Sequence, residues 1–284
     1  MRLGIFAKTF TRPTVEAVFD AIVEHGLSVM QFNFACAGLP SMPTEIPAGL
    51  AERIGSAVRK RSLEMAAVSG TFNIIHPDRK RREAGFQSLA VIASHCRALK
   101  THVITLCTGT RDADDMWRPH PENESAEAWK EMLAGMQRAV ELAEAHDLTL
   151  GVEPELANVI NSAAKARRLL DELQSSRVKI IMDGANLFHG PQIPNARAIW
   201  EDAFDMLGSE IVMAHAKDLT LAEKFSAAGK GDLDWDLYLS LLQRVNFTGP
   251  LILHGLAEDE VASSVHLLQA KLVPVGSVPA RDHA

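Results

Sequence analysis

Short apolar runs rich in β-branched residues alternate with amphipathic stretches along the whole chain. The apolar runs predict eight strands, at 3–7, 28–32, 64–69, 102–107, 148–153, 178–182, 211–216 and 251–254. The stretches between them predict eight helices, near 13–25, 47–61, 80–99, 124–146, 161–174, 194–208, 234–244 and 257–271. Asn161-Ser162 and the segment from Asp232 to Asp234 are suitable N-caps for the fifth and seventh helices. This alternation is typical of α/β proteins with a parallel sheet.

Two folds fit eight strands and eight helices in this order, an open doubly wound sheet and a closed barrel. The strand that begins at residue 3 and the regular count of eight favour closure. No Gly-x-Gly-x-x-Gly follows the first strand, where Ala-Lys-Thr-Phe-Thr-Arg-Pro stands instead, which argues against a dinucleotide-binding fold. The length of 284 residues is near the typical size of a (β/α)₈ barrel. The sequence therefore predicts a single (β/α)₈ TIM barrel over 1–273 and a C-terminal tail at 274–284.

Composition narrows the class of protein further. A chain that is 47% hydrophobic and 23% charged has enough apolar residues for a large core. The net charge of −7 argues against a nucleic-acid groove, which needs a concentrated positive field. No apolar run approaches the roughly 20 residues that cross a bilayer, and the N-terminus is typical of a strand rather than a signal peptide. Three cysteines without paired spacing indicate reduced thiols and a cytoplasmic protein.

Four polar residues stand where apolar strands end. Glu153, Asp183, His215 and His254 follow the strands at intervals of 30, 32 and 39 residues, about one strand-plus-helix unit each. In a closed parallel barrel these four side chains would gather at the carboxyl ends of neighbouring strands, where such barrels build their active sites. Two carboxylates and two imidazoles are a set that holds a divalent metal ion. The sequence therefore predicts a metal-dependent enzyme.

Further candidates lie close to these four in the sequence. Alternation along the strand puts His215 and Lys217 on one face and Asp218 on the other. Lys217 would either neutralise oxyanion charge beside the metal or, with Asp218, brace the end of the strand. Glu155 is a candidate substrate-binding or supporting carboxylate, with a helix-capping role as the alternative.

The residues at these strand ends resemble those of the xylose isomerase-like TIM barrels. The resemblance is carried by the Glu after the fifth strand, Asp-x-x-Asn at 183–186, His-x-Lys-Asp at 215–218 and Gly-Lys-Gly-Asp-Leu-Asp-Trp at 229–235. It covers essentially the whole chain. That superfamily contains sugar and sugar-phosphate isomerases and epimerases and, more distantly, endonuclease IV. The motifs are specific for the fold and the metal centre and carry little information about the substrate.

The resemblance implies one divalent ion, Mn²⁺, Zn²⁺, Co²⁺ or Mg²⁺, held by Glu153, Asp183 and His215. A site with two carboxylates and two imidazoles would also suit Fe²⁺. The resemblance also implies substrate contacts by Asn186 and by His76, which follows the third strand. The sequence departs from the family at the fourth ligand position, where His254 replaces the expected Glu. In the family two Glu residues move the proton, so the resemblance also implies a catalytic role for Glu153. His254 would therefore ligate the metal or act as a general acid/base, and a third possibility is that Glu258 reaches back to the site.

These features predict an isomerase or epimerase that acts on a sugar, sugar phosphate or keto-polyol through an enediolate. A dehydratase or lyase that uses the same metal site on a keto-sugar or inosose is the alternative. The resemblance to related barrels also implies a homo-oligomer. Two other functions compete. A nuclease of the endonuclease IV type would need further metal ligands and a basic groove, and a non-enzymatic barrel would explain the change at His254.

Overall fold

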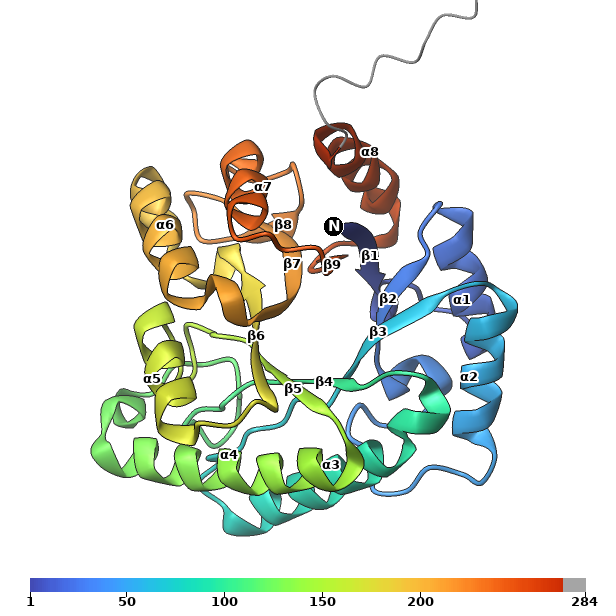
Figure 1. Cartoon of the computed structure of the whole chain (residues 1–284), viewed down its shortest axis with the longest axis horizontal. Helices are drawn as coiled ribbons and strands as arrows, with labels where there is room; N and C mark the ends of the chain where they lie inside the picture. The colour runs from blue at the N-terminus through green and yellow to red at the C-terminus, as the bar shows by residue number, and fades with distance from the viewer. Residues whose placement is uncertain (273–284) are drawn as a thin grey trace, which may run out of the picture.

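The computed structural model describes residues 1–272, and the predicted tail at 274–284 lies outside this part. Strands and helices alternate around a ring, with the strands inside and the helices outside (Figure 1). The strands are β1 (Arg2–Phe6), β2 (Val29–Phe32), β3 (Glu64–Ser69), β4 (Val103–Leu106), β5 (Thr149–Val152), β6 (Val178–Asp183), β7 (Ile211–Leu219), β8 (Phe225–Ala227) and β9 (Pro250–Leu253). The helices are α1 (Val15–Glu24), α2 (Leu50–Lys60), α3 (Arg79–Leu99), α4 (Ala126–His146), α5 (Ala163–Leu173), α6 (Ala196–Leu207), α7 (Trp235–Arg244) and α8 (Val261–Leu272).

The sheet closes on itself. Its order is β6-β5-β4-β3-β2-β1-β9-β7, and a further pairing between β6 and β7 joins the two ends. All the pairings around this ring are parallel. The predicted (β/α)₈ barrel is therefore confirmed. The short strand β8 stands apart from the ring, because it pairs antiparallel with the end of β7.

Helix starts follow the predicted capping residues. The Ser162 side chain accepts a hydrogen bond from the backbone N–H of Lys165 at the start of α5, and Asp234 does the same for Leu237 at the start of α7. Each cap satisfies a backbone donor that has no partner within the helix, which is worth about 1 kcal/mol. Both predicted caps are confirmed, so the helix starts that flank the last barrel strands are fixed locally.

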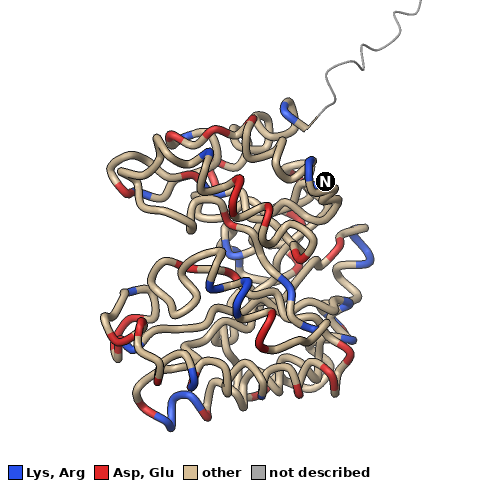
Figure 2. The backbone as a smooth tube through the Cα atoms, turned by 60° about the vertical axis from the view of Figure 1, so that its left-hand side comes forward, with Lys and Arg blue, Asp and Glu red and all other residues tan. Residues whose placement is uncertain are grey.

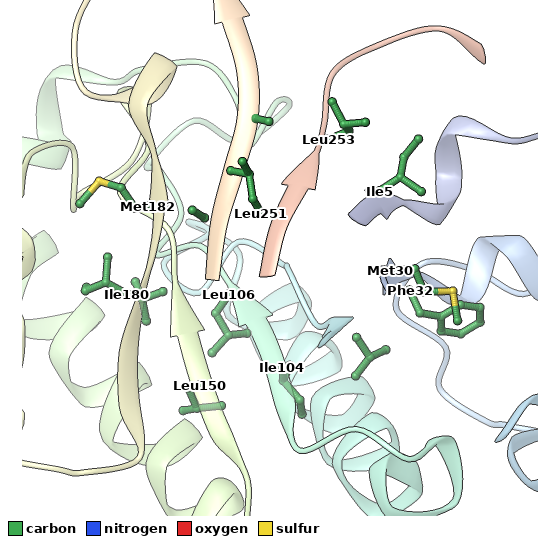
Figure 3. Packing of buried hydrophobic residues seen from close by; sticks show 14 of the residues in the cluster. Ile5, Met30, Phe32, Ile104, Leu106, Leu150, Ile180, Met182, Leu251 and Leu253 are labelled. Carbon is green, nitrogen blue, oxygen red and sulfur yellow. The ribbon is translucent and has the colours of Figure 1, made fainter. Parts of the chain in front are cut away.

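Two layers of apolar side chains hold the barrel together. The outer layer lies between the strands and the helices and includes Ile5, Met30, Ile104, Leu150 and Leu253 (Figure 3). The inner layer fills the barrel and consists of residues from six different strands, namely Val29, Ala67, Val103, Ile181, Met213 and Ile252. Because side chains alternate along a strand, the residues two positions further on also face inward. They are all polar, and we call them the polar layer: Gln31, Ser69, Thr105, Asp183, His215 and His254.

In the part of the chain that the structure describes, charged residues do not separate into one acidic and one basic region. Basic and acidic residues are interspersed along the backbone (Figure 2), and many form ion pairs, such as Arg61 with Asp20 and Arg138 with Glu83. The three cysteines are free thiols, as predicted. Within residues 1–272, no helix combines the length and apolar character that crossing a membrane requires.

Candidate metal centre

Three of the four predicted ligands converge at the carboxyl ends of β5, β6 and β7. Glu153 directly follows β5, Asp183 is the last residue of β6, and His215 lies in the middle of β7. One potential ligand atom from each lies within 4.8 Å of the other two. The His215 Nδ1 is 3.4 Å from Glu153 Oε1 and 3.6 Å from Asp183 Oδ2. Asp183 and His215 are buried, so the triad lies inside the mouth of the barrel.

The triad leaves buried polar atoms without hydrogen bonds. Among the described residues, Asp183 Oδ2, His215 Nδ1, His254 Nδ1 and Thr105 Oγ1 are buried and have no hydrogen-bond partner. The Asp183 Oδ2 does lie 3.0 Å from Lys217 Nζ, but as an ion pair outside hydrogen-bond geometry. An unsatisfied buried polar atom costs about 1–3 kcal/mol. Carboxylate oxygens and an imidazole nitrogen facing one point are the donor set of a divalent cation, so these residues fit such an ion.

His254 lies beside the triad rather than within it. Its ring stacks on that of His215, with the ring centres 4.8 Å apart and the planes 19° from parallel, and it also stacks on Phe6. The nitrogen lone pairs of an imidazole lie in the ring plane. A cation in the ring plane of His215 would therefore lie off the plane of His254. Burial lowers the pKa of His254 well below its usual value, and the charges of His215 and Lys217 add to this effect, so its imidazole is neutral.

A single buried ammonium faces several carboxylates at this site. The Lys217 Nζ donates a hydrogen bond of 2.6 Å to Asn186 Oδ1, and it lies 4.0 Å from the centre of the Phe225 ring. Burial opposes its charge, but Asp183, Glu153 and Glu155 outweigh burial and raise the pKa of Lys217, so it stays protonated. Burial raises the pKa of Glu155 to about 7, against the opposing charge of Lys217. Several acidic side chains thus lie together around one ammonium, and their oxygens are ligand atoms that a divalent cation could use.

Asn186 links the carboxylates to Lys217. Its amide nitrogen donates to Glu153 Oε1 and to Glu155 Oε2, both at 2.7 Å, while its oxygen accepts from Lys217. Both amide hydrogens are therefore used within the protein, and Asn186 holds the two carboxylates in place. The substrate contacts predicted for Asn186, Glu155 and Lys217 stay predictions.

His76 lies in the loop after β3 and bonds to two backbone groups. Its Nδ1 accepts a hydrogen bond of 2.9 Å from the N–H of Asp78, and its Nε2 lies 3.0 Å from the carbonyl oxygen of Ala113. These bonds tie the loop after β3 to the loop after β4. The substrate contact predicted for His76 stays a prediction, and the visible role of its ring is to connect the two loops.

Asp218 points to the opposite side of β7 from Lys217, as the alternation predicted. Its carboxylate accepts hydrogen bonds from the backbone N–H groups of Gly229 and Leu233 and from the indole of Trp235. The segment 229–235 is thereby fastened to the end of β7. Of the two roles considered for the Lys-Asp pair, Asp218 braces the strand end while Lys217 faces the carboxylates.

Two residues near the centre were not among the predicted site residues. The Gln31 Oε1 lies 3.0 Å from the second ring nitrogen of His215, Nε2, and the Gln31 amide nitrogen donates to Ser69 Oγ at 3.2 Å. Both are buried members of the polar layer. The signal for them is present in the sequence, because Gln31 is a polar residue inside the otherwise apolar strand Val-Met-Gln-Phe.

Several solved structures have the same fold at low sequence identity. A 3-keto-D-glucoside 4-epimerase from E. coli is 17% identical, with a TM-score of 0.72 over 95% of this chain and 99% of that chain. A probable 3-DHS dehydratase from Bacillus anthracis is 14% identical, with a TM-score of 0.75 over 95% and 99% of the two chains. A D-tagatose 3-epimerase-like protein is also 14% identical, with a TM-score of 0.74 over 96% and 97%. At this level of identity the similarity establishes the fold alone.

Comparison with curated proteins gives no match. A family model does match, and it covers residues 19–271, which include every strand from β2 onward and all three residues of the triad. With its closed barrel and its acidic and imidazole side chains at the strand ends, the chain belongs to the xylose isomerase-like TIM barrel family.

Proposed function

We propose that this protein is a divalent-metal-dependent isomerase or epimerase that acts on a sugar, sugar phosphate or keto-polyol. The observation that carries the proposal is the convergence of Glu153, Asp183 and His215 at the mouth of the barrel, where Asp183 Oδ2 and His215 Nδ1 are buried without hydrogen-bond partners among the described residues. Glu153, Asp183 and His215 hold the metal ion. When bound, the ion stabilises negative charge on the two adjacent oxygens of an enediolate, charge that develops only in the transition state.

His254 is the general base in this proposal. A base has to be unprotonated before it accepts a proton, and burial lowers the pKa of His254 well below its usual value, which keeps its imidazole unprotonated. Its Nδ1 has no partner among the described residues, so it is free to take a proton from the carbon next to the substrate carbonyl. Stacking on Phe6 and His215 fixes the plane of the ring. In an isomerisation His254 then delivers the proton to the adjacent carbon. An epimerisation instead needs a proton from the opposite face of the carbon, and Glu153 is the candidate for that role.

Deuterium exchange tests the proposal. The protein is incubated in D₂O with Mn²⁺ and a panel of ketoses and keto-inositols, and the carbons next to each carbonyl are followed by NMR. We expect deuterium at one such carbon of at least one compound, and His254→Asn is expected to slow exchange by about 10²- to 10⁴-fold while metal binding is retained. His189→Asn is the matched control, because His189 is an exposed histidine paired with Glu223.

Three outcomes count against parts of this proposal. Absence of exchange in every compound contradicts enolate chemistry. Loss of metal binding in His254→Asn would make His254 a ligand instead of the base. Metal binding that survives Glu153→Gln unchanged contradicts the assigned ligand set.

The same site also suits a dehydratase, and the probable 3-DHS dehydratase among the structures with the same fold supports this second candidate. After a neutral imidazole has taken the proton from carbon, it is an imidazolium that can protonate a departing β-hydroxyl group. Release of water with formation of a conjugated carbonyl, seen as new ultraviolet absorbance in the exchange experiment, would select this reaction over isomerisation.

A further inference from the structure

Gln31 contacts the predicted metal ligand His215 from across the barrel. Gln31 lies on β2 and His215 on β7, and β1 and β9 separate these strands in the sheet order. The contact joins Gln31 Oε1 to His215 Nε2 at 3.0 Å, while His215 Nδ1, the other ring nitrogen, faces Glu153 and Asp183. Gln31 is 4% exposed and His215 is 1% exposed. Water therefore has little access to this hydrogen bond.

The direction of the Gln31 amide decides which nitrogen of His215 carries a proton. An amide oxygen only accepts, so with Oε1 toward His215 the Nε2 has to be the donor. When the ring loses one proton on metal binding, Nε2 therefore keeps its proton and the lone pair is on Nδ1, the nitrogen that faces Glu153 and Asp183. With the amide reversed, its N–H₂ would face Nε2, the proton would move to Nδ1, and Nδ1 would have no lone pair to offer a metal.

Ser69 accepts a hydrogen bond from the nitrogen of that amide and so supports its observed direction. The Gln31 Nε2 donates to Ser69 Oγ at 3.2 Å, and Ser69 is a buried residue at the end of β3, beside β2. A reversed amide would place two acceptors against each other unless the hydroxyl turned to donate. Three members of the polar layer, Ser69, Gln31 and His215, are thus joined in a line of hydrogen bonds that ends at the candidate metal centre.

We propose that Gln31, oriented by Ser69, is a positioning residue that presets the tautomer of His215 so that Nδ1 is the metal ligand. This inference rests on the proposed metal centre, and it extends the site to strands β2 and β3, on the opposite side of the barrel. Outer hydrogen bonds of this kind typically change metal affinity by 10- to 100-fold when they are removed.

Two measurements test the inference, the affinity for Zn²⁺ and the position of the proton on the His215 ring. Gln31→Met keeps the volume of the side chain and removes the acceptor, and we expect Zn²⁺ to bind about 10- to 100-fold more weakly in calorimetric titration. Gln31→Glu restores an acceptor oxygen and should bind Zn²⁺ more tightly than Gln31→Met does. Ser69→Ala should weaken binding less than Gln31→Met. Ser264→Ala is the control, because it also removes a buried serine hydroxyl bond, to Ala228, and should leave Zn²⁺ affinity unchanged.

Nitrogen-15 NMR of ring-labelled histidine supplies a readout that a merely structural role would not move. In the Zn²⁺-loaded wild type we expect His215 to carry its proton on Nε2 and to bind zinc through Nδ1. Circular dichroism confirms that each variant is folded before titration. Zinc bound through Nε2, or equal affinity in folded wild type and Gln31→Met, overturns the inference and leaves the proposed function standing. A wild type that binds no divalent metal overturns both.

Discussion

At the scale of single residues, two lysines on adjacent strands show how burial changes the contribution of an ion pair to stability. Lys217 on β7 has a side chain that is 7% exposed and pairs with the fully buried carboxylate of Asp183. Lys179 on β6 pairs with Glu210 at 2.6 Å, but both side chains are partly exposed. Water screens the second pair, which is worth less than about 1 kcal/mol. The Lys217–Asp183 pair is buried, so water could not solvate the charge that remains if one partner were removed.

Lys217→Met is expected to destabilise the metal-free protein by about 3 kcal/mol, because removing the ammonium leaves buried carboxylates without their counter-charge. Urea denaturation in the presence of a chelator measures this loss. Lys179→Met, the matched control, should cost less than about 1 kcal/mol. Added Zn²⁺ should recover part of the loss in Lys217→Met, since a divalent cation would then be the main positive charge at the site. Equal losses in the two variants would contradict the buried charge cluster.

At the scale of elements, the extension of β7 beyond the barrel sets the shape of one side of the mouth. β7 runs to Leu219 and pairs antiparallel with β8, with Lys217 opposite Ala227 and Leu219 opposite Phe225. Phe225 then lies over the ammonium of Lys217. Asp218, which is fully buried, holds the segment after β8 through its bonds to backbone and indole N–H groups.

Asp218→Asn is expected to loosen this hairpin, because the new amide N–H₂ faces donors where the carboxylate accepted, at a cost of about 1–3 kcal/mol. Trypsin should then cut faster at Lys224 and Lys230, the exposed lysines on either side of β8. Mass spectrometry of a time course gives the rate at each site. Asp236→Asn serves as the control, because Asp236 is an exposed carboxylate on α7 that pairs with Lys271. Cleavage at the wild-type rate in Asp218→Asn would show that its bonds do not hold the hairpin.

The sequence predicts the barrel elements well and this hairpin poorly, for a physical reason. The barrel strands are buried on both faces, so their apolar runs stand out, and the predicted strand 178–182 differs from β6 by a single residue. β8 has three residues and is partly exposed, which is too short for an alternating pattern to appear. The predicted strand at 211–216 accordingly ends before the observed β7, whose last residues pair with β8 instead of with the barrel.

At the scale of the whole molecule, the candidate site is the second inward-facing layer of the barrel. The apolar inner layer supports it from below, and the same alternation that places Ile181 and Met213 inside the barrel places Asp183 and His215 there too. This relation could have been predicted from strand register in the sequence. The hydrogen bond from Gln31 to His215 could not, because sequence distance does not reveal which side chains meet across a barrel.

A bound metal ion would also be part of what stabilises the barrel, since it would satisfy the atoms of Asp183 and His215 that lack partners. Free metal at 100 times its dissociation constant stabilises the folded state by about 2.7 kcal/mol. For a protein of this size that corresponds to a rise in Tm of roughly 5 to 10 °C. Thermal unfolding followed by circular dichroism, with chelator and then with excess Zn²⁺, measures the difference.

The sign of the pH dependence follows from His215, whose protonated Nδ1 competes with the metal. Burial alone would lower the pKa of His215, but the charges of Glu153 and Asp183 outweigh burial and raise it to about 9 in the metal-free protein. Below that pH, metal binding has to release a proton, so affinity falls about tenfold for each pH unit. The metal-dependent rise in Tm should therefore be larger at pH 8 than at pH 6 for the same metal concentration. Glu153→Gln should show little metal-dependent rise at either pH, and a rise that is larger at pH 6 in the wild type would exclude His215 as the residue that exchanges its proton for the metal.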